Sequence, residues 1–191
     1  MREKFEFIIY LDLDLHHGDA VQEAFLYSDS VFTASFHFQK PGFFPGTGLE
    51  SERGKGSGEG MNMNVALPFE CNDQQFIAKF KAFEVVVEEI LEEYPNTAIV
   101  IQAGADGLAT DPHKILKLTD VSFLHAINYL KTLDIPLLCL GGGGYCNRSC
   151  AILWTKLTAA LAMDDMNELD LNIKEHEYYE IYLPECQLQI K

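Results

Sequence analysis

The sequence is poor in basic residues: 14 lysines and arginines stand against 29 acidic residues, which gives a formal net charge of −15. Nucleic-acid-binding proteins normally carry a basic face, so we expect no direct nucleic-acid binding. An acidic surface suits a basic substrate or partner, although solubility explains such a charge equally well. No apolar run approaches the ~18 residues of a membrane span, so we also expect no membrane insertion.

The cysteines show no pattern of pairs that would suggest disulfide bonds or a zinc ribbon. The chain has five cysteines, an odd number scattered along the sequence: Cys71, Cys139, Cys146, Cys150 and Cys186. Cys146 and Cys150 are four positions apart, but no second pair completes a zinc-ribbon pattern. This usage indicates a reducing compartment, and the expected location is the nucleus or the cytoplasm.

Four short apolar runs predict strands, and helical patterns lie between them. The runs are rich in β-branched or aromatic residues and cover 7–11, 31–38, 98–102 and 135–140. Asn72-Asp73 and Thr119 can each cap a helix, and a third helix is expected over about 147–163. The alternation predicts βαβ units, hence an α/β fold with a parallel sheet flanked by helices. We treat residues 1–191 as one domain, because no linker or repeat interrupts them.

The most informative segment is the octet 12–19, Asp-Leu-Asp-Leu-His-His-Gly-Asp, which follows the first apolar run. Because side chains alternate along a strand, Asp12, Asp14 and His16 are expected to point the same way. Ligands of open α/β sheets bind at the carboxyl ends of strands, and carboxylate and imidazole groups bind divalent cations. The octet therefore predicts a metal site, with a half-solvated acidic edge strand as the alternative.

Three further segments follow predicted strands at the same end of the sheet. In 41–48, the adjacent Phe43 and Phe44 either line a narrow apolar channel or tuck into the core. In 104–107, Asp106 is a third candidate metal ligand. In 141–145, four glycines allow the backbone to approach a ligand closely, and Tyr145 is placed to donate a hydrogen bond to a reacting oxygen. Together with the octet, these segments give a strong signal of a functional site at the carboxyl ends of the strands.

The four segments resemble, in order and spacing, the motifs of zinc-dependent histone deacetylases of the arginase/deacetylase superfamily. Trp154-Thr155 and the segment 176–179, His-Glu-Tyr-Tyr, are most similar to the class I branch. The resemblance covers nearly the whole chain and implies the arginase/deacetylase fold. It also implies the C-terminal part of the catalytic domain, incomplete at the N-terminus, so that the chain is expected to be a fragment or a truncated product.

The resemblance implies a metal site and an oxyanion donor. Asp14, His16 and Asp106 would hold Zn²⁺, and Tyr145 would donate to the oxyanion that forms when water attacks the acetyl carbonyl. A structural monovalent cation, K⁺, is implied beside the zinc. The groups implied for that cation are Asp12, Asp14, His16, Ser35 and Phe36.

The resemblance also implies supporting roles around this site. Asp12 and Asp19, grouped with Tyr145 as catalytic residues, would each orient a catalytic histidine. Phe44, Gly143 and His113 would line the acetyl-lysine tunnel or its entrance. The family's general acid and base are an adjacent histidine pair upstream of the octet, which these 191 residues do not contain, so the chain alone is expected to be weakly active.

The implied function is deacetylation of acetyl-lysine in histone tails or other proteins, linked to chromatin and transcriptional repression, with co-repressor proteins as possible partners. Two alternatives remain open. One is an acetylpolyamine-type amidohydrolase, which would use the same metal site. The other is a non-catalytic truncated form that binds partners through its open sheet edge. An arginase-like two-manganese site is less suitable, because Asp19 is one place late for an Asp-x-His-x-Asp pattern.

Overall fold

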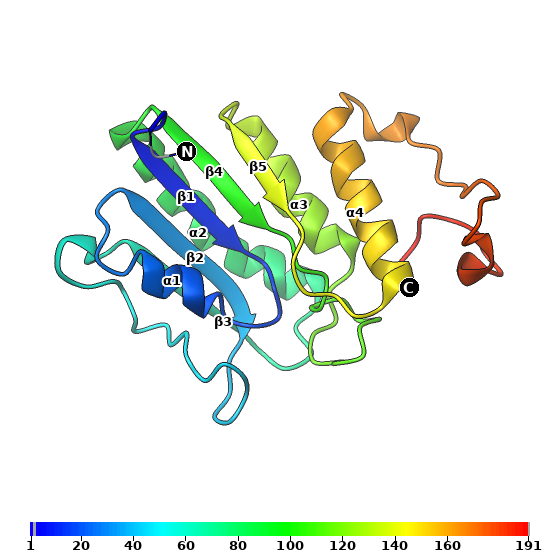
Figure 1. The fold of residues 1–191 in the computed structure, drawn as a ribbon, viewed down its shortest axis with the longest axis horizontal. Coiled ribbons are helices and arrows are strands. Elements are labelled where there is room, and N and C mark those ends of the chain that lie inside the picture. The colour runs from blue at the N-terminus through cyan, green and yellow to red at the C-terminus, as the bar shows by residue number, and fades with distance from the viewer. Residues whose placement is uncertain (2, 191) are drawn as a thin grey trace.

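The computed structural model describes residue 1 and residues 3–190. Its main elements, in chain order, are β1 (Phe7–Asp12), α1 (Asp19–Ala24), β2 (Val31–Phe38), β3 (Asn62–Leu67), α2 (Asp73–Glu93), β4 (Thr97–Gln102), α3 (Asp120–Thr132), β5 (Leu137–Leu140) and α4 (Asn147–Ala162). Short 3₁₀ turns cover Gly56–Gly58, Met166–Glu168 and Tyr179–Tyr182. The strands form one parallel sheet in the order β3-β2-β1-β4-β5 (Figure 1). The predicted α/β class is confirmed.

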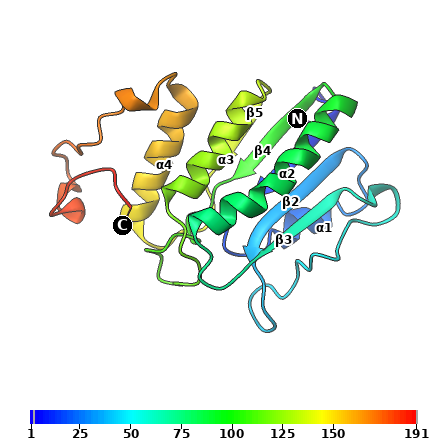
Figure 2. The same cartoon turned by 180° about the vertical axis from the view of Figure 1, so that it is seen from behind.

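The main core lies between the sheet and the helices α2, α3 and α4, which share one side of the molecule (Figure 2). Phe36 of β2 is fully buried, and its ring lies 5.6 Å, 5.5 Å and 6.2 Å from the rings of Phe76, Phe80 and Phe83 on α2. Burial of such a side chain stabilises a fold by about 1.5–3 kcal/mol. This packing anchors α2 beneath the central strands.

The opposite face of the sheet is sparsely covered. The short helix α1 lies in front of it beside β2 and β3 (Figure 1). Over β1, β4 and β5, the described residues place no helix on this side, and Leu138 and Leu140 of β5 are exposed. A small apolar cluster of Ile8, Val31 and Ala98 lies on this part of the molecule. Among the described residues, no helix has the length and apolar character needed to cross a bilayer.

The helix starts follow the local signals. Asn72 and Gln75 form a reciprocal capping box, with Asn72 Oδ1 accepting from the Gln75 N–H at 3.0 Å and Gln75 Oε1 accepting from the Asn72 N–H at 3.1 Å. Thr119 Oγ1 accepts from the N–H of Val121 at the start of α3. Such caps satisfy backbone donors that the helix leaves free, and both predicted starts are confirmed.

Two elements were not predicted from the sequence. β3 contains Asn62 and Asn64, a residue type disfavoured in strands, and both side chains bond to partners distant in sequence: Thr33 donates to Asn62 Oδ1 at 2.7 Å, and Asn64 Nδ2 donates to Gln22 at 2.8 Å. α1 has no buried side chain, so its sequence carries no helical periodicity. The strand predicted over 135–140 starts later, at Leu137.

Candidate metal centre

The octet turns away from the sheet directly after β1, which ends at Asp12. Asp14 and His16 therefore lie beyond the strand, and the expectation that strand alternation aligns them is wrong. Two side-chain bonds shape the turn instead: Asp12 Oδ1 accepts from the N–H of Asp14, and Asp14 Oδ1 accepts from the N–H of His16, both at 3.0 Å. Aspartate commonly makes such turns by binding a backbone N–H two residues on.

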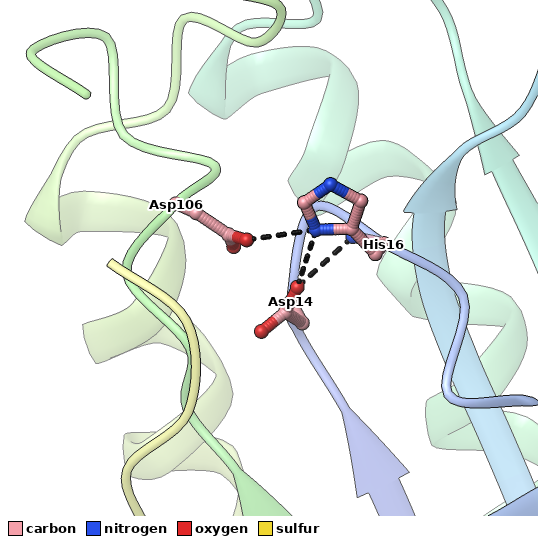
Figure 3. A group of neighbouring side chains, drawn as sticks. All are labelled: Asp14, His16 and Asp106. Atoms are coloured by element: carbon pink, nitrogen blue, oxygen red, sulfur yellow. Dashed lines mark hydrogen bonds and ion pairs between the residues drawn. The ribbon is translucent and has the colours of Figure 1, made fainter. Parts of the chain in front are cut away.

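Asp14, His16 and Asp106 offer ligand-type atoms that all lie within 4.8 Å of one another. Nδ1 of His16 lies 3.1 Å from Asp14 Oδ1 and 2.9 Å from Asp106 Oδ2 (Figure 3). Asp106, from the loop after β4, is fixed because its Oδ1 accepts from the N–H of Leu15 at 2.8 Å. The carboxyl ends of neighbouring parallel strands thus bring Asp106 to Asp14 and His16, although Asp106 lies 90 positions after His16.

The electrostatics of the two carboxyl groups, Asp14 and Asp106, suit a bound cation. Burial, and then the neighbouring Asp14, raise the pKa of Asp106 to about 7. Burial also acts to raise the pKa of Asp14, but hydrogen bonds from Asp106, Gln102 and nearby backbone groups hold it below its usual value. Two carboxylates that are hard to ionise side by side can both be charged once a divalent cation lies between them. Two oxygens and one imidazole nitrogen are suitable zinc ligands and leave a position open.

Gln102 and Gly143 hold the second oxygen of Asp14. The Gln102 amide and the Gly143 N–H each donate to Asp14 Oδ2 at 2.9 Å. Gly143 was expected to line the substrate tunnel. In the structure it lies directly against the carboxylates of Asp14 and Asp106. A Cβ there would lie 2.5 Å from Asp106 Oδ2, so only glycine fits. Gln102 was not identified from the sequence, although a polar side chain at the end of a buried strand is a signal for such a role.

Three rings surround His16. Phe43 stacks on it with a centroid distance of 5.3 Å and an interplanar angle of 3°, whereas Phe44 and His113 present edges at 5.9 Å and 5.3 Å. Phe44 is 72% exposed, and Phe43 is partly buried against the core. Phe43 is thus the closer support of the candidate ligand His16, whereas the resemblance implied a tunnel role for Phe44.

The ring of Tyr145 lies 5.1 Å from the imidazole of His113. The backbone N–H of Tyr145 donates to Oδ2 of Asp111 at 2.8 Å, and Asp111 is almost completely buried. Burial, followed by the charges of Asp106, Asp14 and Asp111, raises the pKa of the Tyr145 phenol. The phenol therefore stays protonated and can donate a hydrogen bond. Asp111 was not identified from the sequence.

Of the groups expected for a monovalent cation, Asp12 and Ser35 lie side by side on neighbouring strands. Asp12 pairs in register with Ser35, and Phe36 follows on β2 with its ring in the main core. Asp12 Oδ2 accepts from the Tyr10 hydroxyl at 2.9 Å, and burial raises the Asp12 pKa to about 7. Ser35 Oγ accepts from the Gly18 N–H and bonds to His37. Asp12 belongs to the buried surroundings of the triad without being one of its three members.

Asp19 lies apart from the triad. It is the exposed first residue of α1, where its Oδ1 accepts from the N–H of Ala20. Together with His17 and Thr47 it lines a separate cleft of about 520 Å³. His17 itself is held between Thr47 and Gln22, at 2.8 Å from each.

The fold and the triad define an α/β protein with a candidate metal centre at the carboxyl edge of a parallel sheet. Residues 1–161 match the family model for the histone deacetylase domain. The chain belongs to the histone deacetylase family, which confirms the resemblance found in the motifs.

Curated relatives agree with this assignment. The chain is 37% identical over 190 residues to Histone deacetylase 8 of Xenopus laevis, covering 100% of this chain and 57% of the relative. It is 35% identical over 190 residues to Histone deacetylase 8 of Danio rerio, covering 49% of that protein. It is 40% identical over 185 residues to Probable histone deacetylase 1-A of Xenopus laevis, covering 96% of this chain and 37% of the relative. The chain spans about half the length of the curated relatives it matches.

Proposed function

We propose that this chain forms the metal and oxyanion half of a zinc-dependent deacetylase that hydrolyses N6-acetyl-lysine in histones or other proteins. The observation that carries the proposal is the convergence of Asp14, His16 and Asp106 within 4.8 Å. The ring of Tyr145 contacts that of His113, which in turn contacts the ring of His16. A chromatin-linked role in the nucleus or cytoplasm, with co-repressor proteins as partners, is part of this proposal. The names of the relatives support its histone substrate alone.

The ligand roles follow from the chemistry of the donor set. Asp14, His16 and Asp106 would hold one Zn²⁺, which would polarise the acetyl carbonyl and acidify the attacking water. Asp14 is kept in place by Gln102 and Gly143, and Asp106 by the Leu15 N–H. Such supporting bonds orient metal ligands and tune their basicity.

Tyr145 supplies the hydrogen bond to the oxygen that becomes negatively charged during attack. Its raised pKa keeps the proton available. Removal of one oxyanion donor typically costs about 10²–10³ in rate. Phe44, Gly143 and His113 are proposed to line the path of the acetyl-lysine side chain, with Phe43 behind the candidate ligand His16.

The general base is proposed to be a histidine pair upstream of the octet, with Asp12 and Asp19 as its orienting carboxylates. Asp19 and the neighbouring cleft support this proposal, because an exposed carboxylate beside a hollow leaves room for a further side chain. Without general acid–base groups, a hydrolase typically loses about 10²–10⁴ in rate. K⁺ is proposed to bind at Asp12, where a buried carboxylate favours a neighbouring cation.

The test begins with the intact mass of the native polypeptide from its own cells. That native protein and the 191-residue chain are then loaded with zinc and assayed for acetate release from an acetylated histone-tail peptide. We expect the native protein to release acetate, and Tyr145→Phe to lower turnover at least about a hundredfold with zinc content unchanged. Tyr178→Phe is the matched control, since the two tyrosines are 59% and 62% exposed. A zinc-loaded native protein that releases no acetate would contradict the proposal.

A further inference from the structure

The loops that follow β4 and β5 run side by side, and backbone hydrogen bonds tie them together. The N–H of Ala103 donates to the carbonyl of Leu140 at 2.9 Å, and the N–H of Ala105 donates to that of Gly143 at 2.5 Å. Both bonds precede Tyr145 in the second loop. They extend the parallel pairing of β4 and β5 beyond the sheet, so the first part of each loop is held in register with the other.

A further tie joins the same loops after Tyr145. Thr110 Oγ1 donates at 2.7 Å to Oγ of Ser149, which is buried in the first turn of α4. Between the ties the loops pack closely: Gly144 has a φ of +138°, and a Cβ there would lie 2.8 Å from that of Ala105. Tyr145 therefore belongs to a short segment that is anchored at both ends.

Asp111 connects the two loops at Tyr145 itself. The Asp111 residue is only 1% exposed, its Oδ2 accepts from the Tyr145 N–H at 2.8 Å, and its Oδ1 accepts from the His113 N–H at 3.0 Å. The Asp111 N–H donates to the Leu108 carbonyl at 2.9 Å, which fixes the backbone that carries the carboxylate. Both carboxylate contacts are with backbone N–H groups. They hold for either protonation state of the His113 imidazole, whose Nδ1 lies 2.8 Å from the same Oδ1.

The bond to Asp111 fixes the peptide plane from which the Tyr145 side chain extends. A rotation of this plane moves the Cα–Cβ bond, and the phenol at the far end of the side chain moves further. Tyr145 is 59% exposed, so packing alone restrains it little. A displacement of about 1 Å at a reacting group can cost about 10² in rate. The backbone bond to Asp111 is therefore well placed to set the position of the phenol.

We propose that Asp111 is a positioning residue for the candidate oxyanion donor, whose carboxylate holds the Tyr145 backbone so that the phenol meets the substrate oxygen. Asp111 does not touch the substrate in this role, and no proton moves to or from it. The inference rests on the proposed function, because it concerns the oxyanion donor of that same site. The contacts that carry it are the bond from the Tyr145 N–H and the burial of the carboxylate that accepts it.

The first experiment measures hydrogen exchange of the Tyr145 amide by NMR in the zinc-loaded native protein, without turnover. In Asp111→Ala we expect this amide to exchange about 3- to 10-fold faster, the value of one hydrogen bond, with the amides inside α4 and the zinc content unchanged. Asp120→Asn is the matched control, because Asp120 is also buried and its carboxylate is bonded to Lys156. There the Tyr145 amide should exchange as in the wild type. An unchanged exchange rate in Asp111→Ala would overturn the proposal.

The second experiment compares turnover of an acetylated histone-tail peptide by the wild type, Asp111→Ala, Tyr145→Phe and the double variant. We expect Asp111→Ala to lower kcat about 10- to 100-fold with KM little changed, because the oxyanion forms only during the attack. In the Tyr145→Phe background the same substitution should cost nothing further, since both act through one phenol. A loss that persists there would mean that Asp111 acts through His113 or through the fold at large, and the proposal would be wrong.

Asp111→Asn keeps the test decisive if alanine at this position prevents folding. Its amide offers one oxygen to two N–H groups, so it can satisfy that of Tyr145 or that of His113 but not both. The proposal predicts that kcat follows the Tyr145 amide: slow exchange goes with wild-type kcat, and fast exchange with a lowered kcat. Fast exchange with wild-type kcat, or slow exchange with a lowered kcat, contradicts it.

Failure of the proposed function looks different from failure of this inference. If the zinc-loaded native protein releases no acetate, the deacetylase proposal falls and this inference falls with it. If the protein releases acetate and Tyr145→Phe lowers turnover while Asp111→Ala does not, only the role of Asp111 falls. Faster exchange of the Tyr145 amide in Asp111→Ala, together with a loss of kcat that vanishes in the double variant, supports both.

Discussion

Asp106 reaches the ring of His16 across 90 positions of sequence, with Oδ2 2.9 Å from Nδ1. β1 and β4 are adjacent parallel strands, so the turns that follow them meet at one edge of the sheet. Nδ1 of His16 also faces Asp14, and both carboxylates are largely buried. This arrangement concentrates negative charge where water is scarce, which a bound cation would offset.

Asp106→Asn should stabilise the protein without metal and abolish its stabilisation by zinc. Burial beside Asp14 raises the folded-state pKa of Asp106 to about 7. The stability that this group contributes is therefore present below its unfolded pKa and is lost as the pH rises toward 7. In unfolding experiments with a chelator at pH 8, we expect Asp106→Asn to exceed the wild type by at least about 1 kcal/mol.

The same unfolding series provides its own controls. Zinc should raise the stability of the wild type and leave that of Asp106→Asn unchanged, since binding to the folded state stabilises it by mass action. Asp164→Asn, at an exposed acidic position, should behave as the wild type in both conditions. A metal-free wild type more stable than Asp106→Asn at pH 8 would contradict this account of the carboxylates.

Phe43 and Phe44 should separate metal binding from substrate binding. Phe43 stacks flat on His16 and also contacts Phe38 at 5.0 Å, whereas Phe44 is mostly exposed. We expect Phe43→Leu to weaken zinc binding, measured by competition with a chromogenic chelator. Phe44→Leu should leave zinc affinity unchanged and raise the KM for acetyl-lysine peptides. Equal effects of both substitutions on zinc affinity would refute this division.

His37 should make the fold sensitive to acid. The side chain is completely buried, with Nδ1 2.9 Å from Ser35 Oγ and Nε2 donating to the Gly48 carbonyl at 3.0 Å. Burial, and then the neighbouring His17, lower its pKa to about 4. Stability from neutral His37 is therefore complete above its unfolded pKa of about 6.5 and is lost as the pH falls toward 4.

The measurement is the difference in unfolding free energy between the wild type and His37→Gln over that pH range. Carboxylates common to both proteins cancel in this difference. The wild type should lose up to about 3 kcal/mol relative to the variant between pH 6.5 and pH 4. A difference that does not vary with pH would show that His37 is not held neutral by the fold.

Potassium should stabilise the wild type through Asp12. Burial raises the pKa of this carboxyl to about 7, so a neighbouring cation would favour its charged form. We expect KCl to raise the melting temperature of the wild type more than choline chloride of equal ionic strength does. In Asp12→Asn the two salts should act alike. A potassium effect of the same size in both proteins would place the ion elsewhere.

Local signals in the sequence predicted the elements that depend on local contacts. The capping residues Asn72 and Thr119 act within three positions of themselves, so the starts of α2 and α3 were predictable. β3 was not predictable, because Asn62 and Asn64 are disfavoured in strands and bond to partners distant in sequence, Thr33 and Gln22 among them. Partners distant in sequence leave no periodic pattern.

The same distinction applies to the site. Asp14, His16 and Asp106 could be predicted to meet, because each follows a strand of one parallel sheet. Asp111 could not, since its importance lies in a bond to Tyr145, 34 positions away in a separate loop. Side chains of the octet were expected to alternate as in a strand, and this expectation failed for a local reason. β1 ends at Asp12, and the carboxylates of Asp12 and Asp14 then bond to backbone N–H groups two residues on, which forms a turn where the strand was expected to continue.

The most direct test of the central claim is the zinc K-edge X-ray absorption spectrum of the zinc-loaded protein. The account predicts one zinc per chain, bound by one imidazole nitrogen and carboxylate or water oxygens at about 2.0–2.2 Å, without sulfur. Asp106→Asn should lose this bound zinc. A spectrum with sulfur at about 2.3 Å would assign the metal to the cysteines instead. That result would contradict a metal centre built from Asp14, His16 and Asp106.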